Sequence, residues 1–169
     1  MARPLQHSTE FSYPVDKILA TIAEDAAIRA RLDAIGGHEA ELLSHQKRQN
    51  GYRYTLRQGI PADKLPSIVR KIHSGDLIVK REQEWVIGGD GTVTGTGGAT
   101  VSGVPGSITV TTALTPRGDG AKLQVNGKVE VSIPLIGGKL EQTIAEQVVK
   151  LLRREDEFVA QQLAGAETG

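Results

Sequence analysis

The chain has 169 residues, and its 20 lysines and arginines balance its 20 aspartates and glutamates, so the formal net charge at pH 7 is zero. A balanced protein has no overall field to hold a polyanion, which argues against nucleic acid as a partner. The absence of cysteine excludes disulfides, thiolate catalysis and cysteine-ligated metals, and the length fits one domain spanning residues 1–169.

The first part of the chain is predicted to form one strand and two helices. In residues 5–13 the apolar or aromatic side chains, with His7 and Thr9, share one face, and only polar side chains share the other, which is typical of a strand. Two segments with apolar residues at helical spacing follow, over residues 15–22 and 25–35. Gly36 and Gly37 are expected to end the second helix, because glycine commonly follows a helix terminus.

Six further strands are predicted in the middle of the chain. Residues 38–49 and 52–60 flank Asn50-Gly51, a strong hairpin signal because both residues accept positive φ. One or two helical turns are expected near residues 65–72. The remaining strands are expected at residues 77–87, 92–102, 107–115 and 121–133, and the last is predicted to carry a bulge at Asn126-Gly127.

The C-terminal segment predicts a long amphipathic helix after Pro134. It would run for about 25 residues and extend roughly 37 Å, at about 1.5 Å per residue. Glu141 is assigned to its polar face, and residues 165–169 are expected to form a frayed tail. Its apolar stripe consists of Leu140, Ile144, Val148, Leu151, Leu152, Phe158, Val159 and Leu163.

Two short segments resemble a known superfamily. HSTEFSYPVDKI (residues 7–18) and IPLIGGKLE (residues 133–141) are similar to segments of START-like (SRPBCC) proteins, which include birch-pollen-allergen-like and polyketide-cyclase-like proteins. The branch they resemble is uncharacterised. The resemblance implies an α+β helix-grip fold, in which a seven-stranded curved antiparallel sheet (β-α-α-β6-α) surrounds a long C-terminal helix. It also implies a cavity for lipids, sterols, polyketides or plant hormones, but no defined catalytic motif.

One predicted strand places a charge on an apolar face. Arg81 and Gln83 share the face that carries Leu77 and Trp85 in the strand 77–87. If that face turns inward, Arg81 requires a carboxylate partner or an anionic ligand group, because a buried unpaired charge is costly. The alternative is that Arg81 lies at a solvated rim. The candidate ligand-binding residues are Tyr52, Tyr54, Arg81, Gln83, Trp85, Leu151 and Phe158.

No catalytic residue, metal site or cofactor is assigned. The four histidines lack the spacing of a helical zinc site, and the glycine-rich stretch 88–106 opens no helix that could hold a phosphate. Breaker-rich residues 60–75 and 88–91 are expected to be mobile segments at a cavity entrance.

The leading functional hypothesis is noncatalytic binding or transport of a small hydrophobic molecule, lipid or polyketide-like. The alternatives are a cyclase-like or hydrolase-like enzyme, with His7 and Arg81 as isolated candidates, and a ligand-free interaction module. The N-terminal residues lack the apolar core of a signal peptide, and no run approaches the roughly 18 apolar residues that span a bilayer. A cytoplasmic location without stable membrane insertion is therefore expected, and the oligomeric state stays open.

Overall fold

The computed structural model describes residues 2–37 and 39–168, so His38 of the predicted strand 38–49 lies outside the described residues. The strands are β1 (Ala2–Phe11), β2 (Glu41–Arg48), β3 (Gly51–Ile60), β4 (Leu77–Ile87), β5 (Val93–Val101), β6 (Val104–Arg117) and β7 (Gly120–Val131). The helices are α1 (Val15–Ala23), α2 (Asp25–Ile35), the 3-10 turn η1 (Ala62–Lys64), α3 (Ser67–Arg70) and α4 (Gly137–Thr168).

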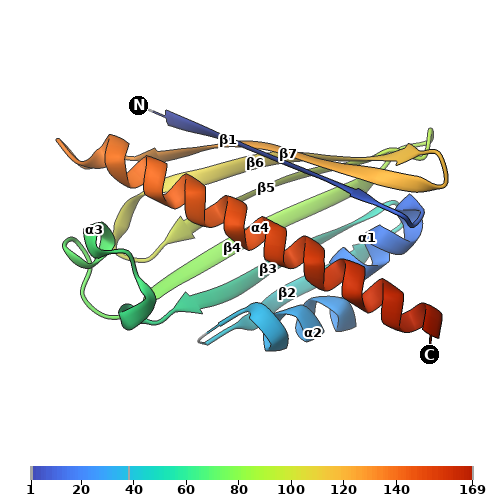
Figure 1. Cartoon of the computed structure of the whole chain (residues 1–169), viewed down its shortest axis with the longest axis horizontal. Coiled ribbons are helices and arrows are strands. Elements are labelled where there is room, and N and C mark those ends of the chain that lie inside the picture. Colours follow the sequence, from blue (N-terminus) through green and yellow to red (C-terminus); the bar gives the residue numbers. More distant parts are fainter. Residues whose placement is uncertain (1, 38, 169) are drawn as a thin grey trace.

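The seven strands form one antiparallel sheet in the order β1-β7-β6-β5-β4-β3-β2. Strands β2 and β3 are joined at Asn50-Gly51, so the predicted hairpin is confirmed. The sheet curves, and the long helix α4 runs diagonally across one of its faces (Figure 1). The predicted α+β architecture, a curved seven-stranded sheet with a long C-terminal helix, is therefore confirmed.

The helices occupy different ends of the sheet. Helices α1 and α2 lie beside the C-terminal half of α4, and α3 lies at the opposite end (Figure 1). Helix α4 has 32 residues, so it is longer than the sequence predicted. Its backbone is helical through Thr168, and Gly169 of the predicted tail lies outside the described residues. Within those residues, no helix is both long and apolar enough to cross a membrane.

The apolar core is divided into two clusters. One joins α1 and α2 to β3, β4 and the end of α4, and includes the fully buried Ile18 and Ile28. The other joins the start of α4 to the α3 segment and to β1 and β7, and includes Leu140 and Val129. Residues of both clusters line the same internal cavity, described below.

Strand β7 corrects one prediction. The pairing of β7 with β1 and with β6 runs through Asn126 and Gly127 without a register shift, so the predicted bulge is wrong. Apolar residues keep the same parity on both sides of this pair, whereas a single inserted residue would have reversed it. The irregular positions lie instead between Leu42 and Ser44 and between Ala99 and Val101.

The position of Glu141 corrects a second prediction. The sequence places this glutamate on the polar face of the last helix, but it is only 2% exposed. Its Oε2 accepts a hydrogen bond from the backbone N–H of Val131 at 2.9 Å, at the end of β7. The side chain is buried because it satisfies a backbone donor where the sheet ends and the chain turns towards α4.

Candidate functional site

A cavity of about 690 Å³ lies between the sheet and α4. Its walls come from the inward face of β3 to β7, from one side of α4, from the end of α2 and from residues 60–72. Apolar side chains predominate, among them Leu56, Val110, Val125 and Ile144. A volume of this size falls in the range of small-molecule sites.

The cavity brings together five of the seven candidate residues. Tyr54, Arg81, Gln83, Trp85 and Leu151 all line it. Four of them come from the adjacent strands β3 and β4, where Tyr54 pairs with Gln83 and Leu56 pairs with Arg81. The face of β4 that carries Arg81 therefore turns inward, which is the first of the two alternatives for this face.

Two candidates lie away from the described lining of the cavity. The hydroxyl of Tyr52 donates a hydrogen bond to Oε1 of Glu24 at 2.8 Å, between α1 and α2. Burial, with help from Glu24, raises the pKa of Tyr52 to about 12. Phe158 is half-buried on α4 and is not among the residues that line the cavity. Neither residue is among those that line the cavity, so their contact with a ligand stays a prediction.

Glycines on β5 make room for two candidate side chains. Gly95 pairs with Trp85, and Gly97 pairs with Gln83. A Cβ atom at Gly95 would lie 2.8 Å from two atoms of the Trp85 ring, and one at Gly97 would lie 2.3 Å from Oε1 of Gln83. The side chains of Trp85 and Gln83 on β4 therefore lie across Gly95 and Gly97 of the neighbouring strand β5, and this arrangement leaves space between the sheet and α4.

The indole of Trp85 is held in place by a polar contact. Its Nε1 donates to the hydroxyl of Tyr54 at 2.9 Å. The Tyr54 ring stacks on His45, with ring centroids 5.9 Å apart and planes inclined by 10°. His45 in turn donates from Nε2 to the carbonyl of Ala23 at 2.7 Å. These contacts give the polar atoms of Trp85 and Tyr54 partners within the protein, as buried aromatic side chains of this kind usually require.

Arg81 has the carboxylate partner that its burial requires. Its Nη1 lies 2.7 Å from Oε2 of Glu155 on α4, and its Nη2 lies 3.3 Å from Oε1. Nη1 also donates to Oε1 of Gln58 at 3.0 Å. Burial by itself raises the pKa of Glu155, but Arg81 and Arg31 outweigh it and hold that pKa below its usual range. The carboxylate is therefore ionised at neutral pH.

Arg31 of α2 is the second guanidinium beside Glu155. It is 5% exposed and lines the cavity. Its Nη1 donates to the carbonyl of Ile22 at 3.0 Å, while its Nε is 3.8 Å from Oε2 of Glu155. That separation is an ion-pair distance but is too long for a hydrogen bond.

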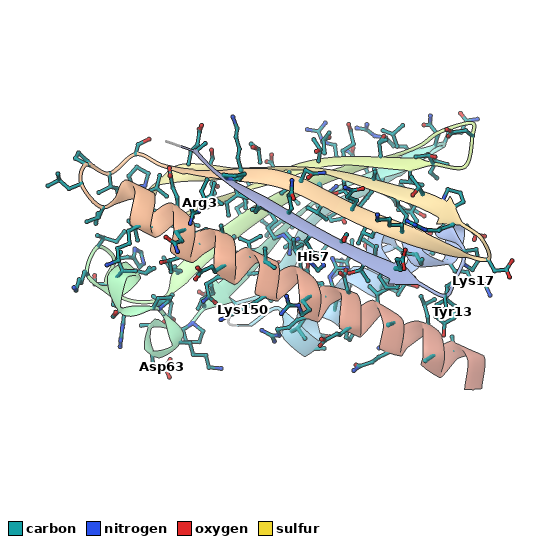
Figure 2. The ribbon with its side chains drawn as sticks, turned by 45° about the horizontal axis from the view of Figure 1, so that its top comes forward. Arg3, His7, Tyr13, Lys17, Asp63 and Lys150 are labelled. Atoms are coloured by element: carbon teal, nitrogen blue, oxygen red, sulfur yellow. The ribbon has the colours of Figure 1, made fainter. Side chains whose placement is uncertain are left out.

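A separate acid–base pair lies on the β1 side of α4. Nε2 of His7 is 2.5 Å from Oδ2 of Asp156, and Thr9 donates to the same oxygen. His7, on β1, lies beside α4 (Figure 2). Burial raises the pKa of Asp156 although the hydrogen bonds from Thr9 and His7 oppose the rise. Asp156 lines the cavity, whereas His7 is not among the residues that do.

Residues 60–75 and 88–91 differ in their relation to the cavity. Lys64, Leu65 and Val69 of the first segment line it. None of residues 88–91, which connect β4 and β5, is among the lining residues. The first segment therefore contributes to the cavity wall and the second does not, and the mobility of both segments stays a prediction.

The polar residues of the cavity wall that the sequence did not single out include Arg31, Gln58, Glu155 and Asp156. A signal for two of them is present. Arg31 comes three residues after Ile28, and Glu155 comes four residues after Leu151, so both occupy positions on an apolar helix stripe. A charged residue at such a position indicates a buried partner, although the spacing does not show which one.

The chain matches a known protein family over most of its length. Residues 6–163 match the family described as "Protein of unknown function (DUF2505)". The uncharacterized protein Rv0481c of Mycobacterium tuberculosis is 32% identical over 150 residues, covering 86% of this chain and 82% of that protein. The uncharacterized protein Mb0491c of Mycobacterium bovis matches with the same identity and coverage.

Solved structures with low sequence identity share the fold. TTHA0849 from Thermus thermophilus has a TM-score of 0.65 at 12% identity, covering 97% of this chain and 99% of that chain. Norcoclaurine synthase from Thalictrum flavum, in complex with dopamine and hydroxybenzaldehyde, has a TM-score of 0.57 at 11% identity, with coverage of 98% and 88%. Ara h 8.0201 has a TM-score of 0.59 at 11% identity, with coverage of 95% and 99%. The chain therefore belongs to the DUF2505 family of proteins of unknown function, and it has the helix-grip fold of START-like and birch-pollen-allergen-like proteins.

Proposed function

We propose that this protein binds a small, largely apolar molecule, such as a lipid or a polyketide-like compound, in the cavity between the sheet and α4. The observation that carries the proposal is the 690 Å³ of unfilled volume beneath α4. Protein interiors are generally close-packed and contain few voids larger than a water molecule, so a void of this size favours a binding role. A ligand-free interaction module with a filled core is therefore the weaker alternative.

The composition of the wall supports an apolar ligand with a polar end. Leu56, Val110 and Val125 offer apolar surface, and Arg81 and Gln83 offer polar groups beside it. At about 25 cal/mol per Å², enclosing roughly 300 Å² of ligand surface contributes about 7 kcal/mol before ordering costs. We expect micromolar affinity. The complex of norcoclaurine synthase with dopamine and hydroxybenzaldehyde supports the view that this fold accommodates small organic molecules.

Filling the cavity tests the proposal. Trp85 is the one tryptophan in the chain and lines the cavity, so its fluorescence reports on ligands without a label. We expect Val110→Phe and Ala99→Leu, which enlarge wall residues, to weaken binding of an apolar dye at least tenfold while the protein stays folded. The matched control is Thr109→Phe, because Thr109 neighbours Val110 but is exposed on the opposite face of β6.

Native mass spectrometry followed by lipid extraction would then identify the ligand. A copurified molecule in stoichiometric amount is expected in the wild type and is expected to be lost in Val110→Phe. The proposal fails if the wild type repeatedly carries no such molecule and also binds no apolar dye.

Catalysis in the same cavity is the second candidate, and Asp156 is the observation that favours it. This carboxyl lines the cavity, has a raised pKa and contacts His7. A group of this kind can exchange a proton with a bound molecule. The test compares the molecules copurified with wild type and with Asp156→Asn: an enzyme yields a different compound from the variant, and a carrier yields the same compound from both.

The cytoplasmic location expected from the N-terminal residues stays a prediction. Fractionation of the host cell, with detection of the protein in the membrane and lumenal or periplasmic fractions, would check it.

A further inference from the structure

We infer that the ligand carries a single anionic head group, of the carboxylate class, and that Arg31 of α2 binds it. This inference rests on the proposed function and adds the chemical class of the ligand and the residue that selects it.

Arg31 has hydrogen-bonding capacity that the protein leaves unused. Its guanidinium has five N–H groups, and Nη1 uses one of them for the carbonyl of Ile22. Within residues 2–37 and 39–168, no acceptor lies within hydrogen-bond distance of Nε or Nη2. The closest approach of Arg31 to Glu155 is the 3.8 Å from Nε to Oε2, which is too long for a hydrogen bond. In the same described residues, no fully enclosed side-chain nitrogen lacks a partner. The unused N–H groups are therefore not fully enclosed, and Arg31 is one of the residues that line the cavity.

The charges around Arg31 leave one positive charge without its own counterion. Glu155 is the carboxylate beside both arginines, and Arg81 occupies both of its oxygens. Asp156, the next residue on α4, is directed to β1, where it contacts Thr9 and His7. Two guanidiniums therefore share one carboxylate, which leaves a net positive charge in a largely buried place, so an anion at Arg31 would be stabilised. One surplus charge fits a monoanion better than a phosphate dianion.

The rest of the wall supports the same sign of ligand charge. The chain as a whole is balanced, but the residues that line the cavity include five basic and three acidic ones. The exposed basic side chains among them, Lys64, Lys150 and Arg154, come from η1 and from α4. A cleft lined with an excess of one charge concentrates counter-ions and draws a ligand of opposite charge towards it.

A matched pair of probes separates charge recognition from apolar burial. Dodecanoate and dodecan-1-ol have the same chain and differ in the charge of the head group. With Trp85 fluorescence as the readout, at a pH where dodecanoate is ionised and below its micellar concentration, we expect the wild type to bind the anion at least tenfold more tightly. Hydrogen bonds to charged groups contribute on that scale.

Arg31→Met is the deciding variant. It leaves Arg81 and Glu155 as a neutral pair, and it removes one hydrogen bond to the protein, so the fold is expected to survive. We expect dodecanoate affinity to fall about tenfold or more while dodecan-1-ol affinity changes little. Arg31→Lys retains the charge and is expected to keep part of the preference, and it substitutes for Arg31→Met if that variant does not fold. The control Arg29→Met removes an exposed charge from the same helix, at a residue that is not among those lining the cavity, and is expected to leave the preference in place.

The outcomes distinguish this inference from the proposed function. If the wild type binds both probes equally, or if Arg31→Met weakens both alike, Arg31 does not select an anion and the inference is overturned while the cavity keeps its binding function. If delipidated wild type binds neither probe nor an apolar dye, the proposed function fails and the inference fails with it.

Discussion

Arg81 of β4 and Glu155 of α4 form an ion pair with a closest N–O distance of 2.7 Å, although 74 positions separate them in the chain. The pair connects the middle of the sheet to the helix that crosses it. It also lies in the cavity wall, so the contact that positions α4 is part of the candidate site. Gln58 of β3 adds a hydrogen bond to the same Nη1.

Replacing Glu155 by Gln is expected to lower the free energy of unfolding by about 2–3 kcal/mol. The change leaves two guanidiniums without a carboxylate, and removing one partner of a buried pair is strongly destabilising. We expect the lower part of the usual range because 26% of the Arg81 side chain is exposed. Urea denaturation followed by far-UV circular dichroism measures the change.

Glu157→Gln provides the matched control on the same helix. Glu157 is exposed, and we expect its free energy of unfolding to stay within about 0.5 kcal/mol of the wild type. Equal effects of the two substitutions would show that the Arg81–Glu155 contact does not stabilise the fold.

Gly95→Ala is expected to destabilise the protein by about 1–3 kcal/mol and to change the fluorescence of Trp85. The new methyl group would lie 2.8 Å from the indole ring, which must move, and overpacking of this kind has costs in that range. The control is Gly89→Ala, because a Cβ at Gly89 meets no atom within 4 Å. An unchanged emission spectrum in Gly95→Ala would contradict the arrangement of Trp85 over β5.

Tyr52 is expected to ionise near pH 12, well above the usual tyrosine pKa of about 10. Burial raises its pKa, and the nearby carboxylate of Glu24 adds to the rise. Absorbance of tyrosinate during a pH titration, with circular dichroism to verify folding, measures this step. Tyr52→Phe should remove it, and Glu24→Gln should move it towards lower pH without abolishing it.

The same shift has a consequence for stability. Between about pH 10 and pH 12 the unfolded chain loses the Tyr52 proton while the folded chain retains it, so this contribution to stability is complete below pH 10 and decreases as the pH rises. The difference in unfolding free energy between wild type and Tyr52→Phe should therefore shrink over that interval. A difference that stays constant would argue against the raised pKa.

Residues 61–76 are expected to exchange backbone hydrogens faster than β3 and β4, and to slow when the cavity is occupied. The segment contains only one turn of 3-10 helix and one short helix, and Leu65 and Val69 are its buried apolar residues. Local opening needs little free energy where few apolar contacts are lost. Hydrogen exchange with mass spectrometry measures it, and protection equal to that of the strands would remove this segment as the entrance.

Much of the fold followed from local patterns. Alternation identified the strands, Asn50-Gly51 identified a hairpin, and the helical apolar stripe identified α4. Parity also placed Arg81 on the face of β4 that carries Leu77 and Trp85. If that face turned inward, Arg81 needed a carboxylate partner or an anionic ligand group, and a solvated rim was the alternative. These features depend on residues that are close in sequence, because the periods of strands and helices determine which side chains share a face.

The identity of that partner was decided only by tertiary structure. Glu155 meets Arg81, and Arg31 approaches both, because α2 and α4 pack at particular places along a curved sheet. The cavity volume likewise depends on how Trp85 lies over Gly95 and on where α4 crosses the sheet. The sequence determined which faces turn inward, whereas distances between elements far apart in the chain result from packing, which no local period specifies.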